Sequence, residues 1–168
     1  MSIEHDTTAA QALGQALMLK GWMLASAESC TGGLLSAAIT DVAGSSQWFE
    51  RGFVTYSNEA KMDHLQVSAE TLERYGAVSE ETAMEMAAGT LMATPHAHVA
   101  VSTTGVAGPG GGTPGKPVGM VCFGFARRAE DGIVVRAVTH IFDGDRAAIR
   151  AAAVAFALEN ALELISLR

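Results

Sequence analysis

Apolar and polar positions alternate along the chain in segments that predict a series of helices and strands. Apolar residues at helical spacing predict four helices, over residues 7–20, 34–42 and 79–92 and from Asp145 onward. Short apolar runs predict three buried strands, over residues 22–27, 49–56 and 98–103. Residues 118–126 and 133–142 are expected to pair as a hairpin. The polar residues expected to cap further helix starts are Asn58, Ser68 and Ser79.

The order of these elements indicates the fold class. Helices and strands alternate through the first two thirds of the chain, and the hairpin then completes the sheet. This order is typical of an α/β protein built as a three-layer α/β/α sandwich with a mixed β-sheet. The chain has 168 residues, and it shows no internal repeat and no long linker. We therefore expect a single domain over residues 1–168.

Composition and charge narrow the classes of partner. The chain is 49% hydrophobic and 17% charged, which supports a folded core. A net charge of −7 without a basic stripe argues against nucleic-acid binding, although a small anion can still bind in a locally positive pocket. No run of 18 apolar residues is present, so we expect no membrane span. The polar start and the two cysteines, Cys30 and Cys122, predict a reduced cytoplasmic protein with free thiols.

The segment from Ala27 to Gly33 lies between a predicted strand and a predicted helix. Such a turn leaves the first backbone N–H groups of the helix free to hold a phosphate or an oxyanion. Ser29 is a candidate nucleophile, and the alternative is that Ser29 or Thr31 only caps the helix. Cys30 is a rival nucleophile, because a helix N-terminus can lower a thiol pKa; its alternative is a small buried hydrophobic residue.

A serine nucleophile needs a base, and Lys61 is the candidate. A lysine can act as a base where burial or a nearby positive charge lowers its pKa toward neutrality. Tyr56, at the end of a predicted strand, can relay a proton or orient the pair. The alternative is a solvated lysine beside a tyrosine at the edge of the core.

Residues 105–117 form a glycine-rich segment whose backbone can approach a ligand closely. The segment contains G-x-G-x-x-G and the start of a Walker A motif, but a strand rather than a helix is predicted to follow. Both nucleotide-binding motifs therefore lack their structural context. We expect this segment to contact a ligand, against the alternative of a flexible connector.

Arg146 and Arg150 lie one turn apart on the last predicted helix and can together grip a phosphate. The alternative is pairing with Asp143, with Asp145 or with a neighbouring helix. The five histidines do not have the spacing of a metal site, so no metal is expected.

Five stretches in series resemble the CinA C-terminal domain family, at residues 27–33, 53–61, 76–79, 105–112 and 116–119. The resemblance covers nearly the whole chain. Members of this family hydrolyse the carboxamide of nicotinamide mononucleotide, giving nicotinic acid mononucleotide and ammonia. The extra N-terminal domain of many relatives is expected to be absent here, because the first predicted helix starts at residue 7.

The resemblance implies that Ser29 is the nucleophile, with Tyr56 and Lys61 as its activating partners, and that the loop from Gly105 borders the pocket. The residues that we predict to contact the substrate are Cys30, Thr31, Gly32, Thr104, Gly105, Gly108, Gly110 and Arg146. The implied partner is a small nucleotide substrate, without a cofactor. A homo-oligomer, with a dimer favoured, is also expected. A non-catalytic sensor of pyridine nucleotides, a structural oligomerisation module and direct attack by a water held on Ser29 stay open as alternatives.

Overall fold

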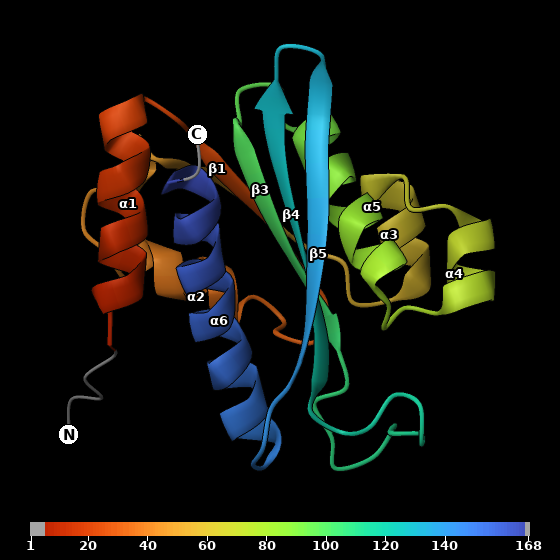
Figure 1. The fold of residues 1–168 in the computed structure, drawn as a ribbon. Coiled ribbons are helices and arrows are strands. Elements are labelled where there is room, and N and C mark those ends of the chain that lie inside the picture. The colour runs from red at the N-terminus through yellow and green to blue at the C-terminus, as the bar shows by residue number, and fades with distance from the viewer. Residues whose placement is uncertain (1–5, 167–168) are drawn as a thin grey trace.

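A mixed sheet of five strands, in the order β2-β1-β3-β4-β5, runs through the middle of the molecule (Figure 1). The computed structural model describes residues 6–166. The strands are β1 (Leu24–Glu28), β2 (Phe49–Val54), β3 (Val99–Gly105), β4 (Met120–Ala129) and β5 (Gly132–Ile141). β1 pairs in parallel with β2 and β3, whereas β4 is antiparallel to β3 and β5. The predicted hairpin is therefore present, and it follows β3 at one side of the sheet.

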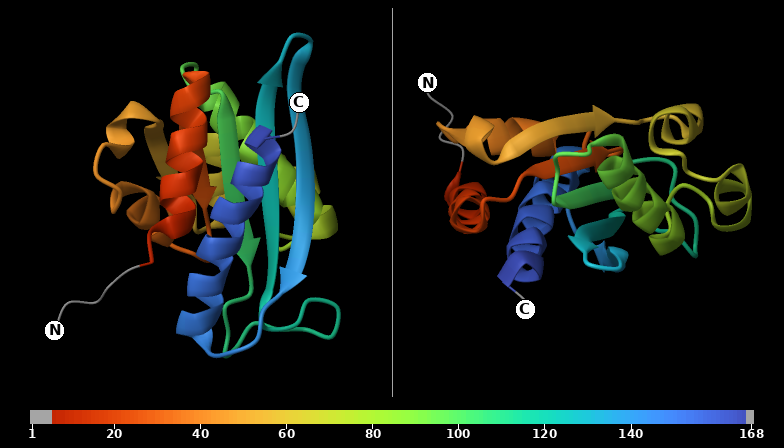
Figure 2. Two further views of the ribbon diagram at one scale, coloured as in Figure 1. Left: turned by 60° about the vertical axis from the view of Figure 1, so that its left-hand side comes forward. Right: turned by 90° about the horizontal axis from the view of Figure 1, so that it is seen from above.

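Helices cover both faces of this sheet (Figures 1 and 2). They are α1 (Thr8–Lys20), α2 (Leu34–Thr40), α3 (Asn58–Leu65), α4 (Ala69–Tyr75), α5 (Glu80–Ala93) and α6 (Arg146–Ser166). α1, α2 and α6 lie on one face, and α3, α4 and α5 lie on the other. The predicted three-layer α/β/α sandwich is confirmed. Within the described residues, no helix is both long and apolar enough to cross a membrane.

Capping residues set most of the helix boundaries. Gly21 closes α1 in the left-handed conformation, with a φ of 66°. Ser68 and Ser79 each accept a hydrogen bond from a backbone N–H in the first turn of α4 and α5, as predicted. The prediction of Asn58 as the cap of α3 was wrong by one residue, because the hydroxyl of Ser57 accepts the N–H of the first turn instead.

Close packing of α5 against the sheet fixes the position of β3. A Cβ on Gly124 of β4 would lie 2.1 Å from the carbonyl oxygen of Ala83, so only glycine permits this approach. The hydroxyl of Ser102 on β3 donates to the same carbonyl at 2.6 Å. The parallel register pairs Glu28 with Val54 and with Thr103, which brings the carboxyl ends of β1, β2 and β3 to one edge of the sheet. Ligands of α/β proteins commonly bind at such an edge.

Candidate active site

A serine–lysine pair lies at the carboxyl ends of β1 and β2. The Nζ of Lys61, on α3, is 3.0 Å from the Oγ of Ser29, in the turn after β1. Lys61 is only 1% exposed. Burial lowers the pKa of Lys61 below its ordinary value, because desolvation penalises the charged ammonium. The structure thus brings together the two residues predicted as nucleophile and base, and Lys61 is not the solvated lysine of the alternative.

Backbone carbonyls form the rest of the polar environment of Lys61. Its Nζ donates to the carbonyl oxygens of Thr55 at 2.9 Å, Tyr56 at 3.0 Å and Ser57 at 3.5 Å. These peptides are free to turn toward Lys61 because β2 ends at Val54, two residues before the predicted end. Neutral carbonyls stabilise an ammonium less than a carboxylate does. They therefore do not cancel the lowering of the Lys61 pKa by burial.

Tyr56 contacts the pair through its main chain. Its carbonyl oxygen accepts hydrogen bonds from Ser29 Oγ at 3.3 Å and from Lys61 Nζ. Its side chain is 64% exposed and lines the cavity beside the pair. The observed contact therefore orients the pair, and proton relay by the phenol stays a prediction.

A cavity of about 250 Å³ opens at the serine–lysine pair. Its lining residues are Ser29, Cys30, Tyr56, Lys61, Ala77, Val78, Thr104, Gly105, Ala107 and Arg146. Four of the predicted substrate contacts, Cys30, Thr104, Gly105 and Arg146, are thus at the cavity. The sequence interpretation missed Ala77 and Val78, although both belong to one of the five stretches that resemble the family.

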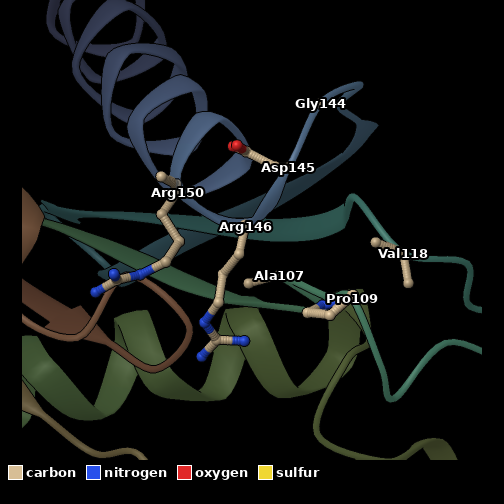
Figure 3. Close-up of a pocket in the computed structure, with 8 residues that line it drawn as sticks. Ala107, Pro109, Val118, Gly144, Asp145, Arg146 and Arg150 are labelled. Atoms are coloured by element: carbon tan, nitrogen blue, oxygen red, sulfur yellow. The ribbon is translucent and has the colours of Figure 1, made fainter.

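The other predicted contacts lie outside this lining. Thr31 is fully buried, and its hydroxyl donates to Glu28 Oε1 at 2.6 Å. Gly32, Gly108 and Gly110 belong to the loops around the cavity. A second hollow, of about 640 Å³, shares Ala107 and Arg146 with the cavity and continues along the start of α6. Figure 3 shows this hollow, with Arg146 and Arg150 extending from the first turns of α6.

Glu28 changes the interpretation of the helix that follows Ser29. Its fully buried carboxylate accepts the backbone N–H groups of Gly33 at 3.2 Å, Leu35 at 2.8 Å and Ser36 at 3.1 Å. We expected the N-terminal donors of this helix to be free for a phosphate or an oxyanion, and that expectation was wrong for these three. The capping alternative is not observed either, because Gly33 is the N-cap of α2 and neither Ser29 nor Thr31 caps it.

Cys30 lies in the same turn but has the properties of a buried apolar residue. It is 7% exposed, and burial raises the pKa of its thiol to about 11. The thiol is therefore protonated near neutral pH, which disfavours it as a nucleophile. Cys30 and Cys122 are both unpaired, as predicted.

The two arginines of α6 bind backbone carbonyls of the site loops. Arg146 Nη1 donates to the carbonyl of Gly108 at 2.7 Å, and Arg150 Nε donates to that of Cys30 at 3.1 Å. The expected alternative of pairing with nearby aspartates is not observed among the described residues, and Asp145 instead caps α6 by accepting the N–H of Ala148. Both arginines thus connect α6 to loops that come from distant parts of the sequence.

Comparison with known proteins agrees with this architecture. The model of the CinA C-terminal domain matches residues 6–165. The chain belongs to the CinA C-terminal domain family. Nicotinamide-nucleotide amidohydrolase PncC from Enterobacter agglomerans is 58% identical over 150 residues, which cover 89% of each chain. The protein of the same name from Escherichia coli K12 is 53% identical over 148 residues, 88% of this chain and 87% of that one.

Solved structures of this family share the fold. Competence/damage inducible protein CihA from Agrobacterium tumefaciens superposes with a TM-score of 0.87 and 43% identity, covering 99% of this chain and 100% of that chain. Competence damage-inducible protein A from Klebsiella pneumoniae superposes with a TM-score of 0.90 and 37% identity, covering 98% and 100%. The family resemblance seen in the five sequence stretches is confirmed.

Proposed function

We propose that this protein hydrolyses the carboxamide of nicotinamide mononucleotide, giving nicotinic acid mononucleotide and ammonia. The observation that carries the chemistry is the 3.0 Å contact between Ser29 Oγ and the buried Nζ of Lys61. The substrate is supported by the two relatives named nicotinamide-nucleotide amidohydrolase, which match most of this chain.

The form of Lys61 that acts as the base is the neutral amine, which burial favours by lowering the lysine pKa. Its Nζ lies 2.9 Å and 3.0 Å from the carbonyls of Thr55 and Tyr56 and 3.0 Å from Ser29 Oγ. The Ser29 hydroxyl, once turned from the Tyr56 carbonyl toward this amine, can give its proton to the lone pair of Lys61. Lys61 takes the hydroxyl proton as Ser29 Oγ attacks the carboxamide carbon. The backbone N–H of Cys30, which lines the cavity, is a donor for the oxyanion that forms.

The remaining steps use the same groups in reverse. The ammonium of Lys61 gives its proton to the amide nitrogen, so the carbon–nitrogen bond breaks and ammonia leaves. Water then attacks the acyl-enzyme as Lys61 accepts a proton from it, and Lys61 returns that proton to Ser29 Oγ as the acyl–oxygen bond breaks. The acid that forms loses its remaining proton to solvent. The product carries a carboxylate where the substrate carried an amide.

The two hollows divide the substrate between them. The smaller one contains Ser29 and Lys61 and takes the pyridine carboxamide. The larger one continues toward α6 and takes the ribose phosphate, with Arg146 at the boundary between the two. Arg146 uses one nitrogen on Gly108, and its other donors are available to an anion.

The test is ammonia release from nicotinamide mononucleotide by the wild type and by the variants Ser29→Ala, Lys61→Met and Cys30→Ala, without added metal. Turnover that survives Cys30→Ala and is lost in the other two variants supports the proposal. A folded wild type that binds the nucleotide without releasing ammonia would favour the sensor instead. A trapped acyl-enzyme on Ser29 would exclude direct attack by a water held on that residue.

Three further expectations belong to this proposal: a single domain over residues 1–168, a homodimer and a cytoplasmic location. Sedimentation velocity of the purified chain tests the homodimer directly. A monomer that retains full turnover would contradict it.

A further inference from the structure

Successive backbone carbonyls in the turn that carries Ser29 each accept a hydrogen bond that fixes their direction. The carbonyl of Ser29 accepts the N–H of Gly32 at 3.0 Å, and the carbonyl of Thr31 accepts the N–H of the first residue of α2. The carbonyl of Cys30, between them, is held by Arg150 Nε at 3.1 Å. Arg150 Nη2 also donates to the carbonyl of Thr31, at 3.3 Å. One guanidinium thus bridges two successive peptides of the nucleophile turn.

The shape of the turn accommodates this guanidinium. Gly32 has a φ of 57°, in the left-handed region that favours glycine, and a Cβ there would lie 3.2 Å from Arg150 Nη2. The Nε and Nη2 atoms form one planar edge of the guanidinium, which matches two acceptors at once. Because the protein's own carbonyls occupy this edge, Arg150 cannot also present it to a phosphate.

Fixed carbonyls also fix the N–H groups on the other side of each peptide. In a trans peptide the N–H points opposite to the C=O, so holding the carbonyl of Ser29 sets the direction of the Cys30 N–H. No backbone carbonyl among residues 6–166 accepts that N–H, and Cys30 lines the cavity. Holding the carbonyls of Cys30 and Thr31 prevents these two peptides from rotating. Such a rotation would move the Cys30 N–H and Ser29 Oγ out of alignment with each other.

We infer that Arg150 is a positioning residue, which holds the Ser29–Gly32 turn so that Ser29 Oγ and the Cys30 N–H meet the same carboxamide. This inference rests on the proposed function and deepens it. It gives the two arginines of α6 different roles, with Arg146 on the substrate side and Arg150 on the turn side. The lining of the two hollows agrees, since Arg146 lines both, whereas Arg150 lines only the larger one and not the cavity at Ser29 and Lys61.

The test compares Arg150→Gln with Arg146→Gln on two substrates, nicotinamide mononucleotide and nicotinamide riboside, which lacks the phosphate. Arg150→Gln is expected to lower kcat by about 10- to 100-fold on both substrates with KM nearly unchanged. A misplaced oxyanion donor should lower kcat less than the complete removal of that donor does. Arg146→Gln is expected to raise KM for the nucleotide far more than for the nucleoside.

A second measurement does not depend on the identity of the substrate. A fluorophosphonate probe labels an activated serine as Ser29 Oγ displaces fluoride, while Lys61 takes the hydroxyl proton and the phosphoryl oxygen uses the same N–H donor. Arg150→Gln is expected to slow this labelling by a factor similar to its effect on kcat. If the wild type is labelled but does not hydrolyse the nucleotide, the proposed substrate fails while the labelling rate still decides the role of Arg150.

Arg150→Lys covers the case in which the glutamine variant does not fold. It keeps the charge but cannot bridge two carbonyls with one planar edge, so kcat and labelling should fall between those of the wild type and Arg150→Gln. Wild-type kcat and labelling in a folded Arg150 variant would overturn the inference. So would a loss that appears only as a raised KM for the nucleotide, because that result assigns Arg150 to the phosphate.

Discussion

The Nζ of Lys61 lies 3.0 Å from the Oγ of Ser29, and its other hydrogen-bond partners are backbone carbonyls. Burial lowers the pKa of this amine, and no carboxylate of residues 6–166 forms an ion pair that would hold it as an ammonium. A lysine in this state can accept the serine proton. The consequences for pH dependence, reactivity and stability can each be measured.

The pH dependence of kcat/KM should report the free Lys61 amine. Activity requires the unprotonated form, so kcat/KM should fall as the pH drops through the pKa of Lys61. That apparent pKa should lie below the ordinary lysine value of 10.5, because burial lowers it. A pH–rate profile with nicotinamide mononucleotide measures it. A pH-independent rate on the acid side, or a limb at the ordinary value or above, would contradict this assignment.

Replacing Cys30 with alanine should leave kcat within a few-fold of the wild type. The thiol has its pKa raised to about 11, so it is protonated near pH 7 and does not act as a nucleophile. Alkylation by iodoacetamide should also be slow in the folded protein and fast in urea. Ser29→Ala, assayed alongside, should lose activity, and loss of activity in Cys30→Ala instead would assign the chemistry to the thiol.

Glu28→Gln should destabilise the fold by about 3 kcal/mol, because an amide replaces a buried carboxylate that accepts several hydrogen bonds. Urea unfolding followed by circular dichroism measures the change. The exposed Glu159 of α6 provides the matched control, and Glu159→Gln should change stability by less than about 0.5 kcal/mol. Equal midpoints for the two variants would show that the carboxylate of Glu28 is not needed.

His98 directly precedes β3, at the end of that strand opposite to the active site, and it should make the free energy of unfolding depend on pH. Its Nδ1 accepts the N–H of Met23 at 2.9 Å, which requires the neutral ring, and burial together with the charge of Arg128 lowers its pKa. This contribution is complete above the unfolded pKa of about 6.5 and is lost as the pH falls from there toward the folded pKa.

Melting temperatures between pH 4 and pH 8 test this contribution of His98. The variant His98→Asn keeps an acceptor but does not titrate, so the difference in melting temperature between wild type and variant should shrink as the pH falls below about 6.5. A constant difference over this range would show that the ring does not titrate differently in the folded state.

The sequence predicted the elements well where local chemistry decides them. Ser68 and Ser79 start α4 and α5, and the hairpin of β4 and β5 forms where expected. The cap of α3 was misplaced by one residue, because Ser57 and Asn58 are both good caps and only the backbone conformation distinguishes them.

The site was predictable in its residues more than in its contacts. Ser29 and Lys61 were identified, but the role of the Tyr56 main chain depends on β2 ending early. The carboxylate of Glu28 and the guanidinium of Arg150 bind backbone groups whose orientation exists only in the folded chain. Residue types and spacing carry no signal for such contacts. The sequence therefore left the α2 donors free and left Arg150 open between a phosphate and an ion pair.

The carboxylate of Glu28 also has a consequence for product release. Hydrolysis converts a neutral amide into an anion, and an open helix N-terminus beside Ser29 would bind that anion more tightly than the substrate. Glu28 already occupies the N–H groups of Gly33, Leu35 and Ser36. Its negative charge also repels a second carboxylate nearby. The fold thus disfavours retention of the acid that the proposed reaction forms, which limits product inhibition.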